Sequence, residues 1–126
     1  MGWDISEKGF RIVLSRDVPK VISEHFASDV DSFLYDQDLS RSDIGTWVLH
    51  TGGPAILKAT AAALDLPDHA LDVSWDCLRR TGNLSSASVL LVLEEFMTRK
   101  RPPAGTYGLL AAMGPGFCAE LVLLRW

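Results

Sequence analysis

Two short segments constrain this chain more than any other feature, because each sets one hydrogen-bond donor among glycine and apolar residues. Residues 47–57 read WVLHTGGPAIL and carry His50, and residues 81–88 read TGNLSSAS and carry Asn83. In both segments the donor stands where a strand or loop gives way to a helix. Helix N-termini favour negative charge, and preorganised donors stabilise a developing oxyanion. The pattern therefore predicts an oxyanion-binding site in an α/β fold.

The stretch before His50 predicts a strand, a helix and a second strand. Residues 10–14 (FRIVL) are rich in β-branched and apolar side chains, as strands are. Apolar residues then recur at helical spacing, which predicts a helix over residues 18–35. Residues 46–49 predict a buried strand that ends at His50. Ligand groups gather at the carboxyl ends of strands in open α/β sheets.

The residues after His50 predict a tight turn into a helix. Glycine tolerates positive φ, and proline presets the φ of a first helical residue, so Gly52, Gly53 and Pro54 lead into a helix over residues 55–64. The same glycines leave no bulky side chain over the imidazole. A further helix is predicted over residues 68–80.

The C-terminal part predicts one enclosed helix and two strands. A helix begins at Ser85 and is apolar on every side over residues 89–93, a pattern typical of a helix surrounded by protein. Strands are predicted over residues 106–113 and 118–126, joined by the tight turn 114–116. The expected fold is α/β, a mixed β-sheet with packed helices and a buried central helix, ending in an antiparallel β-hairpin.

Composition limits the size, location and partners of the protein. A chain of 126 residues with 48% hydrophobic content predicts one domain, residues 1–126. A net charge of −4 excludes a broad basic surface, so no nucleic-acid or anionic-membrane partner is expected. Apolar runs such as residues 89–93 are far shorter than the roughly 20 residues that span a bilayer. Cys77 and Cys118 lack a CxxC or Cys/His cluster, which predicts no metal site, no disulfide framework and a cytoplasmic location.

The candidate residues also have simpler interpretations. Asparagine is common in turns and at helix N-caps, so Asn83 can be a structural residue, and the structural and functional roles are compatible. Ser85, Ser86 and Ser88 lack the G-x-S-x-G elbow that a serine nucleophile needs, and small residues at a helix start mostly permit close packing. Cys77 lies within a helical pattern, where a small buried hydrophobic residue is expected.

The two segments resemble the histidine and asparagine blocks of type III polyketide synthases, the chalcone and stilbene synthase family of thiolase-fold condensing enzymes. Three further stretches agree in order: SRDVPKVI at residues 15–22, MGPG at 113–116 and AELVLLRW at 119–126. The resemblance covers nearly the whole chain and identifies residues 1–126 as the C-terminal, thiolase-like half of such an enzyme. The nucleophilic cysteine of the family lies in the preceding half.

The resemblance implies an acyltransferase that condenses an acyl-CoA starter with malonyl-CoA units and needs no cofactor beyond these substrates. His50 and Asn83 match the catalytic histidine and asparagine, which stabilise the enolate oxygen formed on decarboxylation. The coenzyme A contacts fall on Gly52, Gly53, Pro54 and Ala55. The cavity where the polyketide cyclises is shaped by the turn Gly114, Pro115 and Gly116. Ala112 and Met113 stand where the family usually has Gly-Phe, which predicts a bacterial-type member.

The resemblance also implies protein partners. We expect this half to pack against the N-terminal half of the same synthase and to form a homodimer. The alternative is a stand-alone, non-catalytic thiolase-fold domain that binds acyl-CoA or a protein partner. Retention of both His50 and Asn83 favours the synthase, because a binding domain has no need of both donors.

Overall fold

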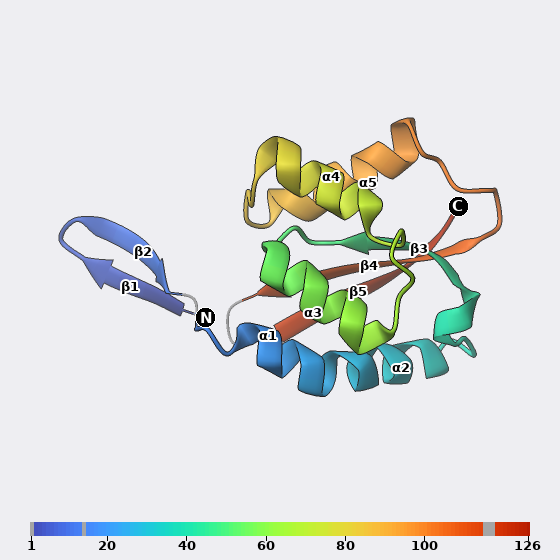
Figure 1. The fold of residues 1–126 in the computed structure, drawn as a ribbon, viewed down its shortest axis with the longest axis horizontal. Coiled ribbons are helices and arrows are strands. Elements are labelled where there is room, and N and C mark those ends of the chain that lie inside the picture. The colour runs from blue at the N-terminus through green and yellow to red at the C-terminus, as the bar shows by residue number, and fades with distance from the viewer. Residues whose placement is uncertain (1, 14, 115–117) are drawn as a thin grey trace.

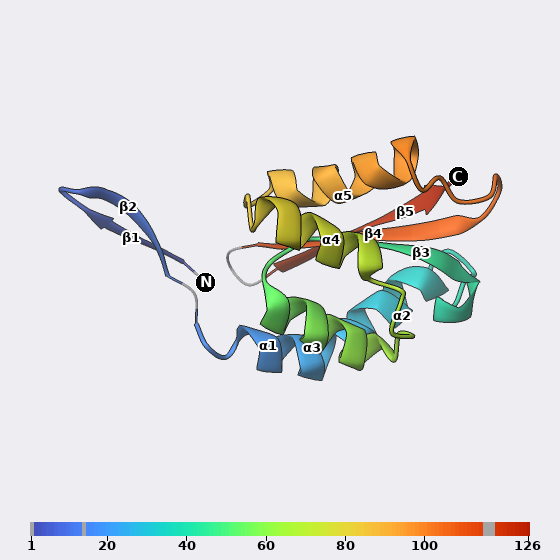
Figure 2. The ribbon, with the colours of Figure 1, turned by 45° about the horizontal axis from the view of Figure 1, so that its top comes forward.

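The computed structural model describes residues 2–13, 15–114 and 118–126, and its body is a three-stranded sheet between two layers of helices (Figures 1 and 2). The strands are β3 (Ile44–Leu49), β4 (Tyr107–Gly114) and β5 (Cys118–Arg125), in that spatial order. β3 runs parallel to β4, and β4 runs antiparallel to β5. The predicted mixed sheet and closing hairpin are therefore confirmed.

β3 is buried on both faces except at Gly45, as its nearly continuous apolar sequence predicts, whereas β4 is buried only in part and the side chains of β5 are half-buried or exposed. Figure 2 shows α1, α2 and α3 on one face and α4 and α5 on the other. Side chains of β3 alternate between the two layers, because successive residues of a strand point to opposite faces. Trp47 and Leu49 belong to the core under the first layer, and Val48 belongs to the core under the second.

The predicted helix over residues 18–35 is confirmed, with a change of helix type inside it. It consists of α1 (Val18–Val21), a π-helical segment η1 (Ile22–Phe26) and α2 (Ala27–Tyr35). Its buried side chains recur every fourth residue, whereas an α-helix turns once in 3.6 residues, so a straight α-helix would rotate them away from the core. The wider π turn, with its i→i+5 bonds, offsets part of that rotation. The residues held on the core face are Val18, Ile22, Phe26, Val30 and Leu34.

The remaining helices are α3 (Pro54–Leu64), α4 (Asp72–Thr81) and α5 (Ala87–Thr98), and a short 3₁₀ turn η2 (Arg41–Asp43) precedes β3. Two of them begin later than predicted. Residues 68–71 form turns before α4. Ser85 has φ +58, in the left-handed region, so the α-helix cannot begin at that residue.

Helix α5 is enclosed only on the side that faces the sheet. Val89, Val92 and Phe96 are buried there. Leu90 is 60% exposed and Met97 is 58% exposed on its outer side, because α5 is in the outer layer and no described residue covers that side. The expectation of a helix buried all round therefore holds for its inner side alone in this chain.

A two-stranded hairpin extends away from this body (Figure 1). Its strands are β1 (Gly2–Ser6) and β2 (Gly9–Val13), which pair antiparallel. The predicted strand over residues 10–14 corresponds to β2, except for its last residue, which lies outside the described residues. β1 was not predicted. Ile5 and Phe10 are each more than 70% exposed on the hairpin.

Candidate functional site

His50 stands at the carboxyl end of β3, as predicted. Its backbone N–H donates to the Ala111 carbonyl at 3.0 Å and so continues the ladder with β4 by one residue. The side chain is half-buried, and its Nδ1 is enclosed with no hydrogen-bond partner among the described residues. Burial lowers the pKa of His50 from its ordinary value of 6.5, because desolvation disfavours the imidazolium. Burial therefore favours the neutral imidazole at neutral pH.

The two glycines after His50 serve different purposes. Gly53 has φ +129, a conformation that side chains rarely adopt, and it leads directly into Pro54 at the start of α3. Gly52 is needed for space: a Cβ there would lie 3.4 Å from Cδ2 of His50 and 3.3 Å from both Cγ atoms of Ile56. Its N–H donates to the His50 carbonyl at 2.9 Å, which tightens the turn. The absence of a side chain at Gly52 thus sets the room available to the imidazole.

Asn83 makes one hydrogen bond with each end of its amide. Its Oδ1 accepts from the Ser85 N–H at 2.9 Å, a turn of the kind asparagine favours. Its Nδ2 donates to the Gly52 carbonyl at 3.4 Å. The first bond fixes which end of the amide faces the His50 loop, and leaves a second N–H on Nδ2. Asn83 is thus a turn residue, but the N-cap of α5 is Ser86.

The structure brings the two predicted segments into contact at the carboxyl end of β3. Besides the bond from Asn83 to Gly52, the Thr51 hydroxyl donates to the Gly82 carbonyl at 3.4 Å. The loop that carries His50 is therefore joined by two hydrogen bonds to the loop that carries Asn83.

The other predicted site residues lie at the same end of the sheet where they are described. Pro54 and Ala55 are exposed at the N-terminus of α3. Gly114 ends β4, whose carboxyl end lies beside that of β3 because the two strands are parallel. Pro115 and Gly116 lie outside the described residues.

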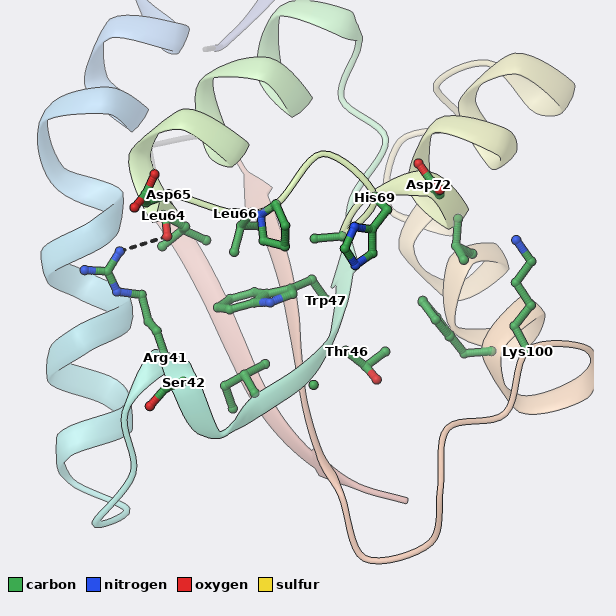
Figure 3. A pocket seen from close by; sticks show the side chains of 16 residues that line it. Arg41, Ser42, Thr46, Trp47, Leu64, Asp65, Leu66, His69, Asp72 and Lys100 are labelled. Carbon is green, nitrogen blue, oxygen red and sulfur yellow. Dashed lines mark hydrogen bonds between the residues drawn. The ribbon is translucent and has the colours of Figure 1, made fainter.

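A cavity of about 530 Å³ lies elsewhere, along the first part of β3 (Figure 3). Trp47 lies in the middle of its lining side chains, with Arg41 at one side and His69 and Lys100 at the other. Arg41 donates to the Leu64 carbonyl at 3.0 Å. No predicted site residue lines this cavity, and no motif in the sequence pointed to it.

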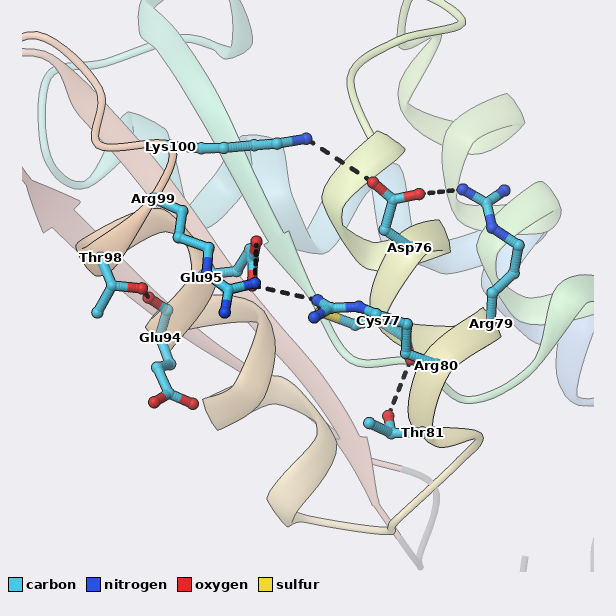
Figure 4. A network of polar contacts seen from close by, with 10 residues as sticks. All are labelled: Asp76, Cys77, Arg79, Arg80, Thr81, Glu94, Glu95, Thr98, Arg99 and Lys100. Carbon is cyan, nitrogen blue, oxygen red and sulfur yellow. Dashed lines mark hydrogen bonds and ion pairs between the residues drawn. The ribbon is translucent and has the colours of Figure 1, made fainter.

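A polar network joins α4 to α5 on the surface (Figure 4). Glu95 accepts from Arg80 at 3.1 Å and pairs with Arg99 at 3.5 Å. Arg80 also contacts Sγ of Cys77, whose pKa is raised mainly by burial. A protonated, buried thiol is a poor nucleophile, which agrees with the prediction that Cys77 is a packing residue. Within the described ranges, no three His, Cys, Asp or Glu side chains are grouped to hold a metal ion, and no helix could cross a membrane.

A family model described as "Chalcone and stilbene synthases, C-terminal domain" matches residues 1–126. Over the same 126 residues the chain is 56% identical to 1,3,6,8-tetrahydroxynaphthalene synthase of Streptomyces peucetius subsp. caesius, covering 100% of this chain and 33% of that protein. It is 34% identical to a putative chalcone synthase of Bacillus subtilis, covering 100% of this chain and 34% of that protein. Both relatives are bacterial proteins.

Solved structures also superpose closely on the chain. The crystal structure of 1,3,6,8-tetrahydroxynaphthalene synthase of Streptomyces coelicolor A3(2), a bacterial type III polyketide synthase, superposes with a TM-score of 0.92 at 31% identity, over 99% of this chain and 36% of that chain. Polyketide synthase PKS-I of the brown alga Ectocarpus siliculosus gives a TM-score of 0.91 at 31% identity, over 98% of this chain and 34% of that chain. The chain thus spans about a third of the length of these relatives.

Proposed function

This chain belongs to the family of chalcone and stilbene synthase C-terminal domains, and from that premise we propose that it is the donor-bearing C-terminal domain of a type III polyketide synthase. The whole enzyme would be an acyltransferase that condenses an acyl-CoA starter with malonyl-CoA. The nucleophilic cysteine would come from the N-terminal half. The names of the relatives support polyketide synthesis as the activity of the whole protein.

The observation that carries this proposal is the hydrogen-bonded contact between the His50 loop and Asn83. When malonyl-CoA loses carbon dioxide, the electron pair of the broken C–C bond passes to the thioester, and negative charge develops on its oxygen. A donor already aimed at that oxygen stabilises the charge without reorganisation. The bond from Ser85 to Oδ1 orients the Asn83 amide, so its Nδ2 remains the end that faces the His50 loop.

His50 is suited to the same oxygen. Because burial lowers the pKa of His50, the imidazole is neutral in this chain and can donate from one ring nitrogen only. The enclosed Nδ1 leaves Nε2 as the nitrogen to meet a ligand. A cysteine thiolate brought beside it would raise the pKa of His50, since an opposite charge favours the imidazolium. That pair would keep the thiolate ready for acyl transfer.

The exposed start of α3 supports the proposed coenzyme A contact. Residues 52–55 end in Pro54 and Ala55, which are exposed residues in the first turn of α3, directly after the loop that carries His50. We assign this stretch, Gly52, Gly53, Pro54 and Ala55, to the coenzyme A substrates. We assign the turn Gly114, Pro115 and Gly116 to the wall of the cavity where the chain cyclises.

The outer side of α5 supports a partner. Leu90 and Met97 are each more than half exposed and, seven residues apart, share one side of that helix. Large exposed apolar side chains that share one side of a helix mark an interaction surface. We assign this surface to the N-terminal half of the synthase, with a homodimer as the assembled state.

We place the enzyme in the reducing cytoplasm, supported by the free, buried thiol of Cys77.

Variants of Asn83 in the full synthase test the assignment. Asn83→Asp keeps an oxygen for the Ser85 N–H and exchanges only the donor for a carboxylate oxygen facing the Gly52 carbonyl. We expect Asn83→Ala to slow malonyl-CoA decarboxylation by roughly 10²–10³-fold, the usual loss for one oxyanion-hole donor. Asn83→Asp should be slower still, because it adds repulsion to the developing oxyanion.

The measurement is carbon dioxide release from labelled malonyl-CoA against single-turnover acylation by the starter. Asn83 variants should spare acylation, His50→Ala should damage both steps, and His69→Ala, at an exposed histidine, should damage neither. If a folded Asn83→Ala synthase decarboxylates at the wild-type rate, Asn83 is a turn residue only. Residues 1–126 alone should form no polyketide, and acylation of Cys77 or Cys118 with product release would contradict the missing-nucleophile argument.

A further inference from the structure

Three buried hydroxyl groups bond to backbone groups in the two segments that carry His50 and Asn83. Thr51 and Ser74 are 0% exposed and Ser88 is 1% exposed, and they come from the His50 loop, α4 and α5 respectively. Each makes its hydrogen bond with a backbone group next to one of the two proposed donors. Buried polar side chains of this kind are rare in the chain, so their gathering at one place needs a reason.

Ser74 fixes the end of β3. Its hydroxyl donates to the Leu49 carbonyl at 3.0 Å. That carbonyl points away from β4, because the N–H of His50 pairs with β4 and the C=O and N–H of one trans peptide point in opposite directions. Without Ser74 the buried carbonyl would lack its bond to α4. Ser74 thus holds in place the backbone of Leu49, the residue directly before His50.

Ser88 fixes the loop on the other side. Its Oγ accepts from the Leu84 N–H at 2.7 Å, and its own N–H donates to the Ser85 carbonyl at 3.1 Å. Ser85 has φ +58, an unfavourable conformation for a serine, and it persists because these bonds hold it. The N–H of Ser85 then holds Oδ1 of Asn83. Ser88 is 1% exposed and its Oγ bonds to the backbone, which agrees with the interpretation of Ser88 as a structural residue at a helix start.

Thr51 connects the two loops directly. It follows His50, and its hydroxyl reaches the Gly82 carbonyl, next to Asn83, at 3.4 Å. We propose that Thr51, Ser74 and Ser88 are positioning residues that set the separation and orientation of His50 and Asn83. The catalytic consequence rests on the proposed function, but the geometric claim does not.

The geometric claim is tested in residues 1–126 by amide hydrogen exchange. Loss of one such bond is worth about tenfold in a local opening equilibrium. We expect the Ser85 amide, which holds Asn83, to exchange about tenfold faster in Thr51→Val, Ser74→Ala and Ser88→Ala. Thr51→Ser should restore protection, and Thr60→Val, the same change at a buried threonine of α3, should leave it unchanged. Unchanged Ser85 protection in all three variants overturns the proposal.

The catalytic claim is tested in the full synthase. Thr51→Val should lower kcat for malonyl-CoA decarboxylation by about tenfold with KM unchanged. If Thr51 acts through Asn83, the same change in an Asn83→Ala background should cost nothing further, whereas a general structural role gives additive losses. Additive losses overturn the positioning role. A wild-type rate for Asn83→Ala instead refutes the proposed function, and the exchange result still decides the geometry.

Discussion

The adjacent glycines Gly52 and Gly53 can be told apart by a matched pair of alanine substitutions. At Gly52, the added methyl would lie 3.3 Å from Ile56 and 3.4 Å from Cδ2 of His50, so these side chains must shift by a few tenths of an ångström. Ile56 is only half-buried and can move, which puts the cost near the lower end of the usual 1–3 kcal/mol for overpacking, about 1 kcal/mol.

At Gly53, the methyl would meet nothing within 4 Å, and the cost is conformational. With φ +129 and ψ 168 the residue occupies a region used almost only by glycine, worth about 1–3 kcal/mol of strain for another residue. The two variants therefore lose similar amounts of unfolding free energy for unrelated reasons.

The pKa of His50 distinguishes the two variants. Gly52→Ala adds burial beside the imidazole, so the pKa of His50 should fall further below its ordinary value, whereas Gly53→Ala should leave it where it is. The assay is an NMR pH titration of the His50 ring, with urea unfolding of each variant as the measure of stability. If the pKa of His50 is the same in both variants, the argument that Gly52 leaves room for the imidazole is refuted.

Three further results are expected from residues 1–126. Because His50 binds a proton less readily folded than unfolded, the free energy of unfolding should fall as the pH drops through 6.5. His50→Gln should reduce that fall in the free energy of unfolding, measured by urea unfolding on both sides of pH 6.5. Leu57→Ala, at a side chain that is 1% exposed, should lower the free energy of unfolding by roughly 2–5 kcal/mol. Leu90→Ala, at a side chain that is 60% exposed, should change it by no more than about 0.5 kcal/mol in the same assay. The chain should self-associate in light scattering, and Leu90→Glu should weaken the association; a monomer at every concentration would contradict the exposed α5 surface as an interface.

Local sequence determined the types of most elements. The spacing of apolar residues predicted the helix over residues 18–35, and the apolar runs predicted β3, β4 and β5. Gly52, Gly53 and Pro54 predicted where α3 begins, because proline and glycine act on the φ of their own residues. The motif around His50 and Asn83 also identified the candidate site, since its residue types are specific enough to be recognised without their contacts.

Local sequence patterns do not specify which elements pair or pack with one another, and the tertiary structure decided this. The parallel pairing of β3 with β4 places Gly114 at the end of the sheet where His50 lies, and a strand pattern does not specify its neighbour. The apolar sequence of α5 predicted burial on every side, but burial depends on what else is present, and only its inner side is covered here. Thr51, Ser74 and Ser88 read as ordinary small residues in the sequence. Their bonds join elements distant along the chain, so only the folded arrangement of β3, α4 and α5 brings their hydroxyls to the backbone that holds His50 and Asn83.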